Sequence, residues 1–192
     1  EQTMGMPATS PRLWSVEEVH ALQEQDPGRR YEVVNGELLV SPAPRRSHQR
    51  VVARLLRLLS DYVERTGLGE VLTSPSDVYR DGRTSVQPDL FVLPLVNGRP
   101  AGDAVDIDPL LVVEVLSPAT ARNDRLVKRA LYQRKAVEYW ILDLDAQLLE
   151  RWLPGADRPE ILSAGFTWHP SGVTEAFALD LPAFFARVLR VD

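Results

Sequence analysis

The 192-residue chain contains no cysteine, and this excludes disulfide bonds and thiolate metal sites. Any bound metal must therefore be held by Asp, Glu, His or backbone oxygen atoms, which favours a hard cation. The chain also lacks a run of about 18 apolar residues and a charged-then-apolar leader. We therefore expect no membrane span, no membrane partner and a cytoplasmic protein. The remaining composition, 44% hydrophobic and 26% charged, is typical of a globular domain.

Lysine is nearly absent as well. Twenty of the 22 basic residues are arginine, and the two lysines are Lys128 and Lys135. A retained lysine indicates either a site that needs a compact, titratable ammonium group or chance, and the two are balanced here. The net charge of −5 argues against a protein that coats nucleic acid permanently, but an enzyme that meets DNA briefly needs only a local basic face.

The hydrophobic pattern predicts one α/β domain over residues 13–192, preceded by a disordered tail of residues 1–12. The expected elements, in chain order, are a helix over 15–25, a hairpin around 35–36, a helix over 47–67, strands starting at 70, 85 and 110, a helix over 119–135, a strand over 137–145 paired with 147–153, and a short helix after 180. The helix over 119–135 is expected to turn Leu126 inward. The strand, helix, strand order between 110 and 143 predicts a parallel pair in a mixed sheet.

One carboxylate interrupts the apolar strand LLVVEVL, residues 110–116. Side chains alternate between the two faces of a strand, so Glu114 shares one face with Leu116, while Val113 and Val115 share the other. Both faces are apolar and are expected to be buried. An ionised carboxylate is costly there unless a cation or hydrogen-bond donors meet it. Glu114 is therefore a candidate functional residue, with a structural ion pair to an arginine as the alternative.

A second acid, Asp89, follows Pro88 in the segment QPDLFVL. Because proline cannot donate to a strand ladder, Asp89 is expected at the irregular start of its strand, and a turn acid is the alternative interpretation. If the two strands are neighbours, Asp89 and Glu114 converge. Two carboxylates at one place repel each other unless a divalent cation bridges them, and Mg²⁺ binds one or two carboxylates together with water. Such a cation lowers the pKa of its water and neutralises charge that develops on a phosphate.

The pair Pro88-Asp89, followed by Glu114 in the sequence Glu-Val-Leu, resembles the motif of the PD-(D/E)XK nuclease superfamily. Five blocks in the right order are similar to a bacterial group of restriction-endonuclease-like proteins called the Uma-two family: RYEVVNGEL, SHQRVVARL, QPDLFVL, VVEVLSPATARNDRLVKRALY and VEYWILD. The resemblance covers residues 13–185. It implies a restriction-endonuclease-like three-layer core, in which helices flank a mixed central β-sheet.

The resemblance also implies a metal-dependent endonuclease that hydrolyses phosphodiester bonds in DNA, with Mg²⁺ as cofactor and Mn²⁺ as a substitute. Asp89 and Glu114 are the expected catalytic residues and metal ligands, and the carbonyl oxygen of Val115 is a further expected ligand. DNA would be a transient partner, and a homodimer is compatible with the sequence. Two alternatives stay open: a degenerate nuclease fold that binds nucleic acid or protein without cleavage, and an enzyme that acts on small phosphoesters.

The chain departs from the motif at Leu116, where the superfamily has its lysine. Leu116 shares the face of Glu114, so the predicted site lacks an ammonium group at that position. Lys128, on the following helix, is expected to supply it and to orient or activate the attacking water, and Tyr132 lies one turn further on the same side. The alternative for Lys128 is an ion pair with Asp124 on a helix face, which would contribute only about 0.2–0.5 kcal/mol.

Weaker candidates lie in the first half of the chain. His48 is expected in the first turn of a long helix, where it either reaches the site or only packs. Glu32 and Glu37 flank the hairpin turn; one of them could supply a further acid to the metal, and Glu37 is retained as a weaker candidate. Four arginines lie opposite the apolar stripe of the long helix, where they either track phosphates or form a solvated face. They are Arg46, Arg50, Arg54 and Arg57.

Overall fold

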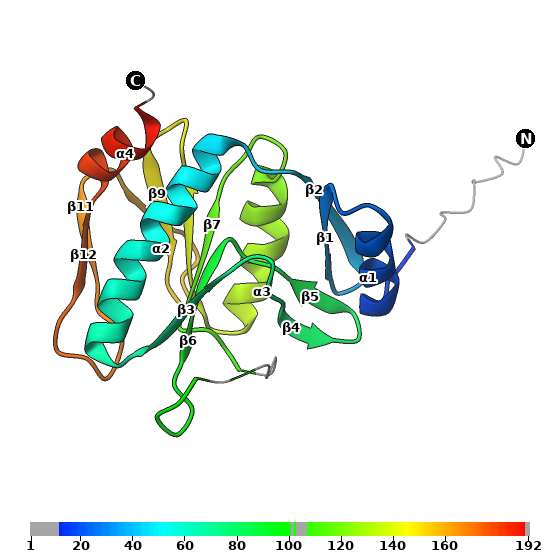
Figure 1. Ribbon diagram of the computed structural model, residues 1–192, viewed down its shortest axis with the longest axis horizontal. Coiled ribbons are helices and arrows are strands. Elements are labelled where there is room, and N and C mark those ends of the chain that lie inside the picture. Colours follow the sequence, from blue (N-terminus) through cyan, green and yellow to red (C-terminus); the bar gives the residue numbers. More distant parts are fainter. Residues whose placement is uncertain (1–11, 101, 103–106, 191–192) are drawn as a thin grey trace, which may run out of the picture.

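A mixed sheet of six strands forms the centre of the molecule (Figure 1). The computed structural model describes residues 12–100, 102 and 107–190, so the predicted tail, residues 1–12, lies outside the described residues except for Arg12. In chain order, the elements are α1 (Val16–Gln25), β1 (Arg29–Val34), β2 (Glu37–Pro42), α2 (Arg46–Thr66), β3 (Gly69–Thr73), β4 (Val78–Asp81), β5 (Thr84–Val86), β6 (Leu90–Pro94), β7 (Leu111–Val115), η1 (Asn123–Lys128), α3 (Arg129–Arg134), β8 (Glu138–Asp143), β9 (Leu148–Trp152), β10 (Glu160–Leu162), β11 (Gly165–Trp168), β12 (Phe177–Asp180) and α4 (Leu181–Leu189).

The strand order of the central sheet is β10-β9-β8-β7-β6-β3. β7 and β8 run parallel, with η1 and α3 between them in the chain, while β8 and β9 form an antiparallel pair. The mixed sheet and both pairings agree with the prediction. Among the described helices, none combines the length and the apolar character that a membrane-spanning segment needs.

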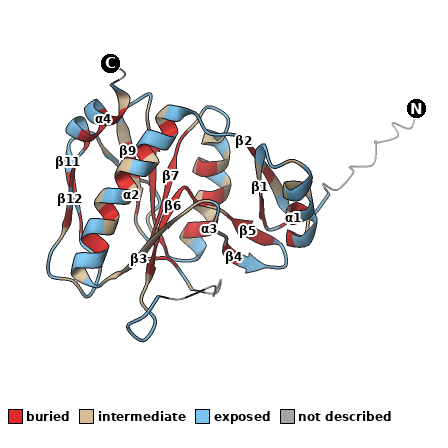
Figure 2. Ribbon diagram, in the orientation of Figure 1, coloured by how far each residue is buried: buried red, intermediate tan, exposed pale blue. Residues whose placement is uncertain are grey.

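Apolar side chains pack on both faces of the central sheet. On one face, α2 and α4 cover Val113 and Val115 of β7. On the other face, α3 and a second, smaller sheet cover Val112 and Leu116. Figure 2 shows the buried residues of α2 turned toward the sheet and its outer side exposed. The expected three layers are therefore present, and Glu114 lies on the face that the smaller sheet covers.

The smaller sheet has the order β2-β1-β5-β4. Its hairpin β1-β2 turns at Asn35-Gly36, where both residues have positive φ angles, as an Asn-Gly pair predicts. Alternation along β1 turns Val33 toward α1 and Val34 toward the central sheet. Arg30 and Glu32 share the face of Val34. The hairpin therefore presents two charged side chains to the central sheet.

Two predicted strands divide in the structure. The strand expected from residue 70 forms β3 and β4, and the strand expected from residue 85 forms β5 and β6. Pro75 and Pro88 lie in the two breaks, because neither residue has an N–H to donate to a ladder. The second break places Asp89 directly before β6, at the irregular start that the sequence predicts.

Gly69, the first residue of β3, lies against the backbone of β6, where an added Cβ atom would collide with the carbonyl oxygen of Leu93. Gly69→Ala should therefore push the strands apart and destabilise the protein by about 1–3 kcal/mol, the usual scale for overpacking. Gly165→Ala is the matched control, because Gly165 also begins a strand but its Cβ would lie 3.8 Å from the nearest atom. Urea denaturation measures both variants; equal stabilities would contradict this packing.

Candidate active site

Asp89 and Glu114 lie beside each other where β6 and β7 pair. The antiparallel register joins Leu90 to Val113, and extending it by one residue places Asp89 opposite Glu114. Residues that lie opposite each other in an antiparallel pair share a face of the sheet. Both acids are almost completely buried, with relative exposures of 4% and 2%. The two carboxylates therefore converge, as the sequence leads us to expect.

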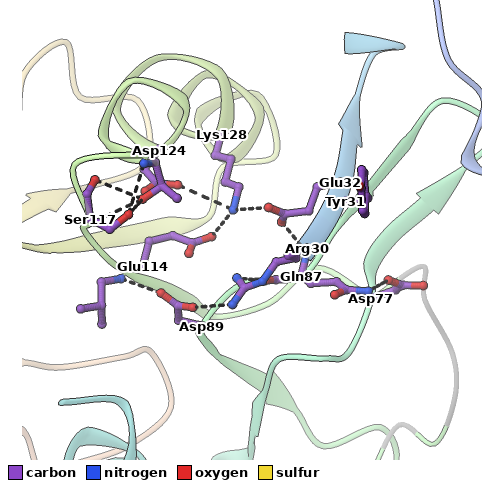
Figure 3. Close-up of polar contacts among 12 residues, drawn as sticks. Arg30, Tyr31, Glu32, Asp77, Gln87, Asp89, Glu114, Ser117, Asp124 and Lys128 are labelled. Carbon is purple, nitrogen blue, oxygen red and sulfur yellow. Dashed lines mark hydrogen bonds and ion pairs between the residues drawn. The ribbon is translucent and has the colours of Figure 1, made fainter. Parts of the chain in front are cut away.

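Three donors hold the carboxylate of Asp89. Arg30 Nη2 donates to Oδ1 at 3.1 Å (Figure 3). The backbone N–H of Val115 and His48 Nε2 both donate to Oδ2 at 2.9 Å. Burial alone would raise the pKa of Asp89, but the hydrogen bond and charge of His48, with the charge of Arg30, hold this pKa below its usual range. Asp89 is therefore ionised throughout the neutral pH range.

Lys128 is surrounded by three carboxylates (Figure 3). Its Nζ lies 2.9 Å from Glu114 Oε1, 2.9 Å from Glu32 Oε2 and 3.7 Å from Asp124 Oδ1. Burial lowers the pKa of Lys128, but the charges of Glu114 and Glu32 outweigh this effect and raise the pKa well above its usual value. Lys128 does pair with Asp124, but its side chain is only 3% exposed. The alternative interpretation is therefore right about the ion pair between Lys128 and Asp124, but the pair is buried and does not lie on a solvated helix face.

A π-helical segment, η1, carries Asp124 and Lys128 into the site. Segments of this kind are short and occur often at functional sites. Asp124 and Lys128 are buried, whereas Leu126 between them is 52% exposed. The expected inward position of Leu126 is wrong, because the polar pair and not the leucine faces the central sheet.

The hairpin β1-β2 holds the segment that precedes Asp89. Glu32 Oε1 accepts the backbone N–H of Gln87 at 2.7 Å, and Arg30 Nη1 donates to the carbonyl oxygen of Gln87 at 2.9 Å. Glu32 thus joins Gln87 to Lys128 as well. Glu37 is exposed at the start of β2. The hairpin therefore contributes Glu32, and the structure does not bring Glu37 to the site.

These contacts make up a buried ion cluster, which consists of Arg30, Glu32, Asp89, Glu114, Asp124 and Lys128. Four carboxylates face two cations, so its net charge is −2 when every group is ionised. Burial, with the charges of neighbouring acids, raises the pKa of Glu114 well above its usual value, and burial raises the pKa of Asp124 to about 6. The repulsion between neighbouring carboxylates thus contributes to the raised pKa values of Glu114 and Asp124.

A cavity of about 480 Å³ opens over the buried ion cluster. Five of the six cluster residues line it, and Glu32 lies behind Lys128. The walls include the end of β2 at residues 41–42, the loop 43–45, His48, the last residue of β7 (Val115), the loop 116–120, and Leu189 of α4. Leu116 thus lines the cavity, and Lys128 reaches the same space from η1.

Two of the weaker candidates have different surroundings. His48 lines the cavity and hydrogen-bonds to Asp89, while its Nδ1 has no hydrogen-bond partner among the described residues. Tyr132 is completely buried and packs at a tilt against Tyr139, with ring centroids 4.8 Å apart. Burial raises the pKa of Tyr132 well above its usual value, and Tyr132 does not line the cavity. His48 is therefore placed to act on the site, and Tyr132 supports it from the core.

The four predicted nucleic-acid-binding arginines, Arg46, Arg50, Arg54 and Arg57, lie on α2 outside the cavity lining. Arg50 uses its Nε to donate to the carbonyl oxygen of Val188 in α4 at 3.1 Å. Arg45, the N-cap residue of α2, does line the cavity and makes no side-chain capping bond. Among the arginines around the start of α2, the one that lines the cavity is therefore Arg45, which is not one of the four predicted arginines.

The donor set fits a divalent cation at Asp89 and Glu114. A carboxylate has about four lone-pair directions, and three of those on Asp89 accept hydrogen bonds. Glu114 Oε2 accepts no hydrogen bond from the described residues. Among those residues, no three His, Asp or Glu side chains form a metal-binding group. Mg²⁺ needs only one or two carboxylates, and its charge would balance the −2 of the cluster.

A family model described as "Putative restriction endonuclease" (Uma2) matches residues 16–182. The chain belongs to this family. A crystal structure described as "a putative nuclease belonging to DUF820", from Anabaena variabilis, is similar to this Uma2 chain with a TM-score of 0.72 at 21% sequence identity, over 91% of this chain and 99% of the other. At that identity the likeness shows the fold. No curated protein matches the chain. The predicted family and the restriction-endonuclease-like fold are thus confirmed.

Two members of the buried ion cluster of this Uma2 chain, Arg30 and Asp124, are not among the predicted site residues. A signal for Arg30 exists in β1, where Arg30, Glu32 and Val34 share one face of a strand whose last residue is apolar. Asp124 precedes Lys128 by one helical turn, so a lysine that enters a site brings this acid with it. Each signal can be used only when it is known which face of β1, or of the helix that carries Lys128, packs against the rest of the fold.

The two lysines of the chain provide a matched test of the cluster. Lys128→Met leaves three buried carboxylates without their shared cation, and at neutral pH it should destabilise the protein by roughly 3–5 kcal/mol. Lys135 is exposed and lies over the ring of Tyr79, so Lys135→Met should cost less than about 1 kcal/mol. Urea denaturation in EDTA measures both values.

The penalty of Lys128→Met should also depend on pH. The pKa values of Glu114 and Asp124 are raised in the folded protein, so their protonation stabilises the fold at low pH; the part due to Asp124 is lost as the pH rises through about 6, and the part due to Glu114 is lost as the pH rises through its own raised pKa. Removing the cation raises these pKa values further. The penalty should therefore shrink in acid, and a penalty that stays constant with pH would show that the acids do not surround Lys128.

Proposed function

We propose that the protein is an endonuclease that hydrolyses phosphodiester bonds in DNA and requires Mg²⁺, for which Mn²⁺ can substitute. The observation that carries the proposal is the contact of 2.9 Å between Lys128 Nζ and Glu114 Oε1, next to the converging pair of Asp89 and Glu114. This contact supports the proposal that Lys128 supplies the ammonium group of the site, although Leu116 occupies the position where the superfamily has its lysine. Membership of the family supports a nuclease.

Asp89 and Glu114 would hold the cation, with the carbonyl oxygen of Val115 as a further ligand. The cation, when bound, supplies positive charge against the charge that develops on the phosphate and makes the attacking water more acidic. Lys128 keeps its proton, because its pKa is raised well above the usual value. It therefore acts as a hydrogen-bond donor that orients the attacking water and stabilises the transition state, and not as a general base.

The remaining cluster residues position these groups. Arg30 and His48 orient the carboxylate of Asp89, and Glu32 fixes the ammonium group of Lys128 through the contact at 2.9 Å. The alternative, a fold that binds without cleavage, is motivated by Leu116. We favour cleavage because Lys128 reaches Glu114 from another element.

Plasmid relaxation tests the activity. The parent should nick or cut DNA with Mg²⁺ or Mn²⁺ and not with EDTA, and Asp89→Asn and Glu114→Gln should each lower the rate about a hundredfold or more, the usual loss for a group that stabilises the transition state. Glu37→Gln is the matched control, because it removes an exposed carboxylate of the hairpin outside the site. Equal rates for parent, Asp89→Asn and Glu114→Gln would remove the proposed site.

Metal binding has its own readout in the absence of DNA. Mg²⁺ at about 100 times its dissociation constant should stabilise the EDTA-treated parent by about 2.7 kcal/mol, which raises the Tm of a domain of this size by roughly 5–10 °C. Glu114→Gln should lose most of this shift, and Glu37→Gln should keep it. Thermal melts followed by circular dichroism provide the measurement. A full shift in Glu114→Gln would place the metal elsewhere.

A further inference from the structure

The buried ion cluster offers no net attraction to an anionic substrate. Its charge is −2 when ionised, and a bound divalent cation brings it only to neutrality. A phosphodiester that enters the cavity is therefore not drawn in by the floor of the site, since opposite contributions cancel there. Affinity for a nucleic acid must come from basic groups outside the cluster.

Three segments of at least ten residues contain more than one basic residue and no Asp or Glu. In residues 125–137, two of the five basic residues, Arg125 and Lys128, pair with acids from elsewhere in the fold. The other two, called here the two basic segments, are residues 42–60 with five arginines and residues 181–190 with two. They place seven positive charges on the loop before α2, on α2 up to residue 60 and on α4. Because the net charge of the whole chain is −5, the remainder carries −12.

The two basic segments meet at the mouth of the cavity. Arg45 and Leu189 both line the cavity, one at the start of α2 and the other at the end of α4. Arg50 joins the helices through its bond to the carbonyl oxygen of Val188. Figure 1 shows α4 beside the half of α2 that starts the helix. The seam between the two helices therefore has the cavity at one of its ends.

Three exposed arginines of these two segments are called here the rim arginines: Arg45 and Arg46 at the start of α2, and Arg187 in α4. None of them forms an ion pair with an acid in the described part of the chain. Arg45 and Arg46 also stand at the positive end of the α2 dipole, where the first turn holds no acid and a cation costs about 0.3–1 kcal/mol. An anion at the seam would remove this cost, because it meets the arginines and the helix end together.

We propose that one strand of a nucleic acid leaves the cavity along the seam between α2 and α4, with the phosphates next to the scissile one bound by the rim arginines. The proposal rests on the proposed nuclease function and extends it to the substrate, which is a polymer of several phosphates and not a small phosphodiester. Arg54 and Arg57 lie outside the binding path. Arg54 and Arg57 are 8 and 11 residues beyond Arg46, about 12 and 16 Å along the helix, and both are thus further than the screening length of about 10 Å.

Fluorescence anisotropy of a labelled single-stranded oligonucleotide tests the path in EDTA, where no cleavage competes. Arg45→Gln with Arg46→Gln should weaken binding and lower the slope of log affinity against log salt by about 0.7 for each lost phosphate contact. Arg54→Gln with Arg57→Gln is the matched control, with the same change of charge on the same helix, and should keep the parent slope. Equal slopes for the two double variants, or no binding by the parent, would overturn the proposed path.

Cleavage separates this proposal from the proposed function. With Mn²⁺, the Arg45→Gln, Arg46→Gln variant should require at least roughly tenfold more oligonucleotide for half-maximal cleavage, since two phosphate contacts are lost, and its loss of activity on bis(p-nitrophenyl) phosphate should be smaller than its loss on the oligonucleotide. If no substrate is cut while the salt slope still depends on the rim arginines, the nuclease function fails and the binding path stands. If DNA is cut and the two double variants behave alike, the function stands and the path fails.

Discussion

The ammonium group of Lys128, buried among three carboxylates, is the interaction on which the rest of the site depends. Each carboxylate comes from a different element: Glu114 from β7, Glu32 from β1 and Asp124 from η1. Without a shared cation these almost completely buried acids would repel one another, and the cost of burying each charge would stand unopposed. One side chain therefore joins the central sheet, the smaller sheet and the helix between β7 and β8.

The position of Asp89 in the buried ion cluster depends on the break between β5 and β6. Pro88 ends the ladder, so the backbone of Gln87 is free to bond with side chains of the hairpin, and Arg30 and Glu32 take both of its polar groups. Asp89 then enters β6 in a fixed orientation and accepts its own three hydrogen bonds. The charged residues of β1 thus fix the acid of a neighbouring segment, and the hairpin is as much part of the site as β7.

The sequence predicts those parts of the site that follow from local patterns. Strand alternation and the proline before Asp89 are sufficient to predict that Asp89 and Glu114 converge, and the gap at Leu116 directs attention to Lys128. The choice between Glu32 and Glu37 is different in kind. Both flank one turn, and only the docking of the hairpin on the central sheet, a contact between segments far apart in the chain, decides which acid is buried.

Leu126 is a second residue whose position local sequence patterns do not predict, here in a helix. Apolar residues are expected to face the core and charged residues the solvent, so the pattern of η1 favours Leu126 as the inward residue. A functional site reverses this preference, because Glu114 and Glu32 supply partners that make a buried Lys128 stable. Local patterns fail here where long-range electrostatic contacts override them.

The excess of acids over cations has an evolutionary consequence. Glu114 and Asp124 have raised pKa values because their charged forms are disfavoured in the fold, so four acids around two cations carry an electrostatic cost at neutral pH. Selection for stability alone would therefore not favour an excess of acids over cations. A lineage that abandons the chemistry should lose this excess before it loses the core.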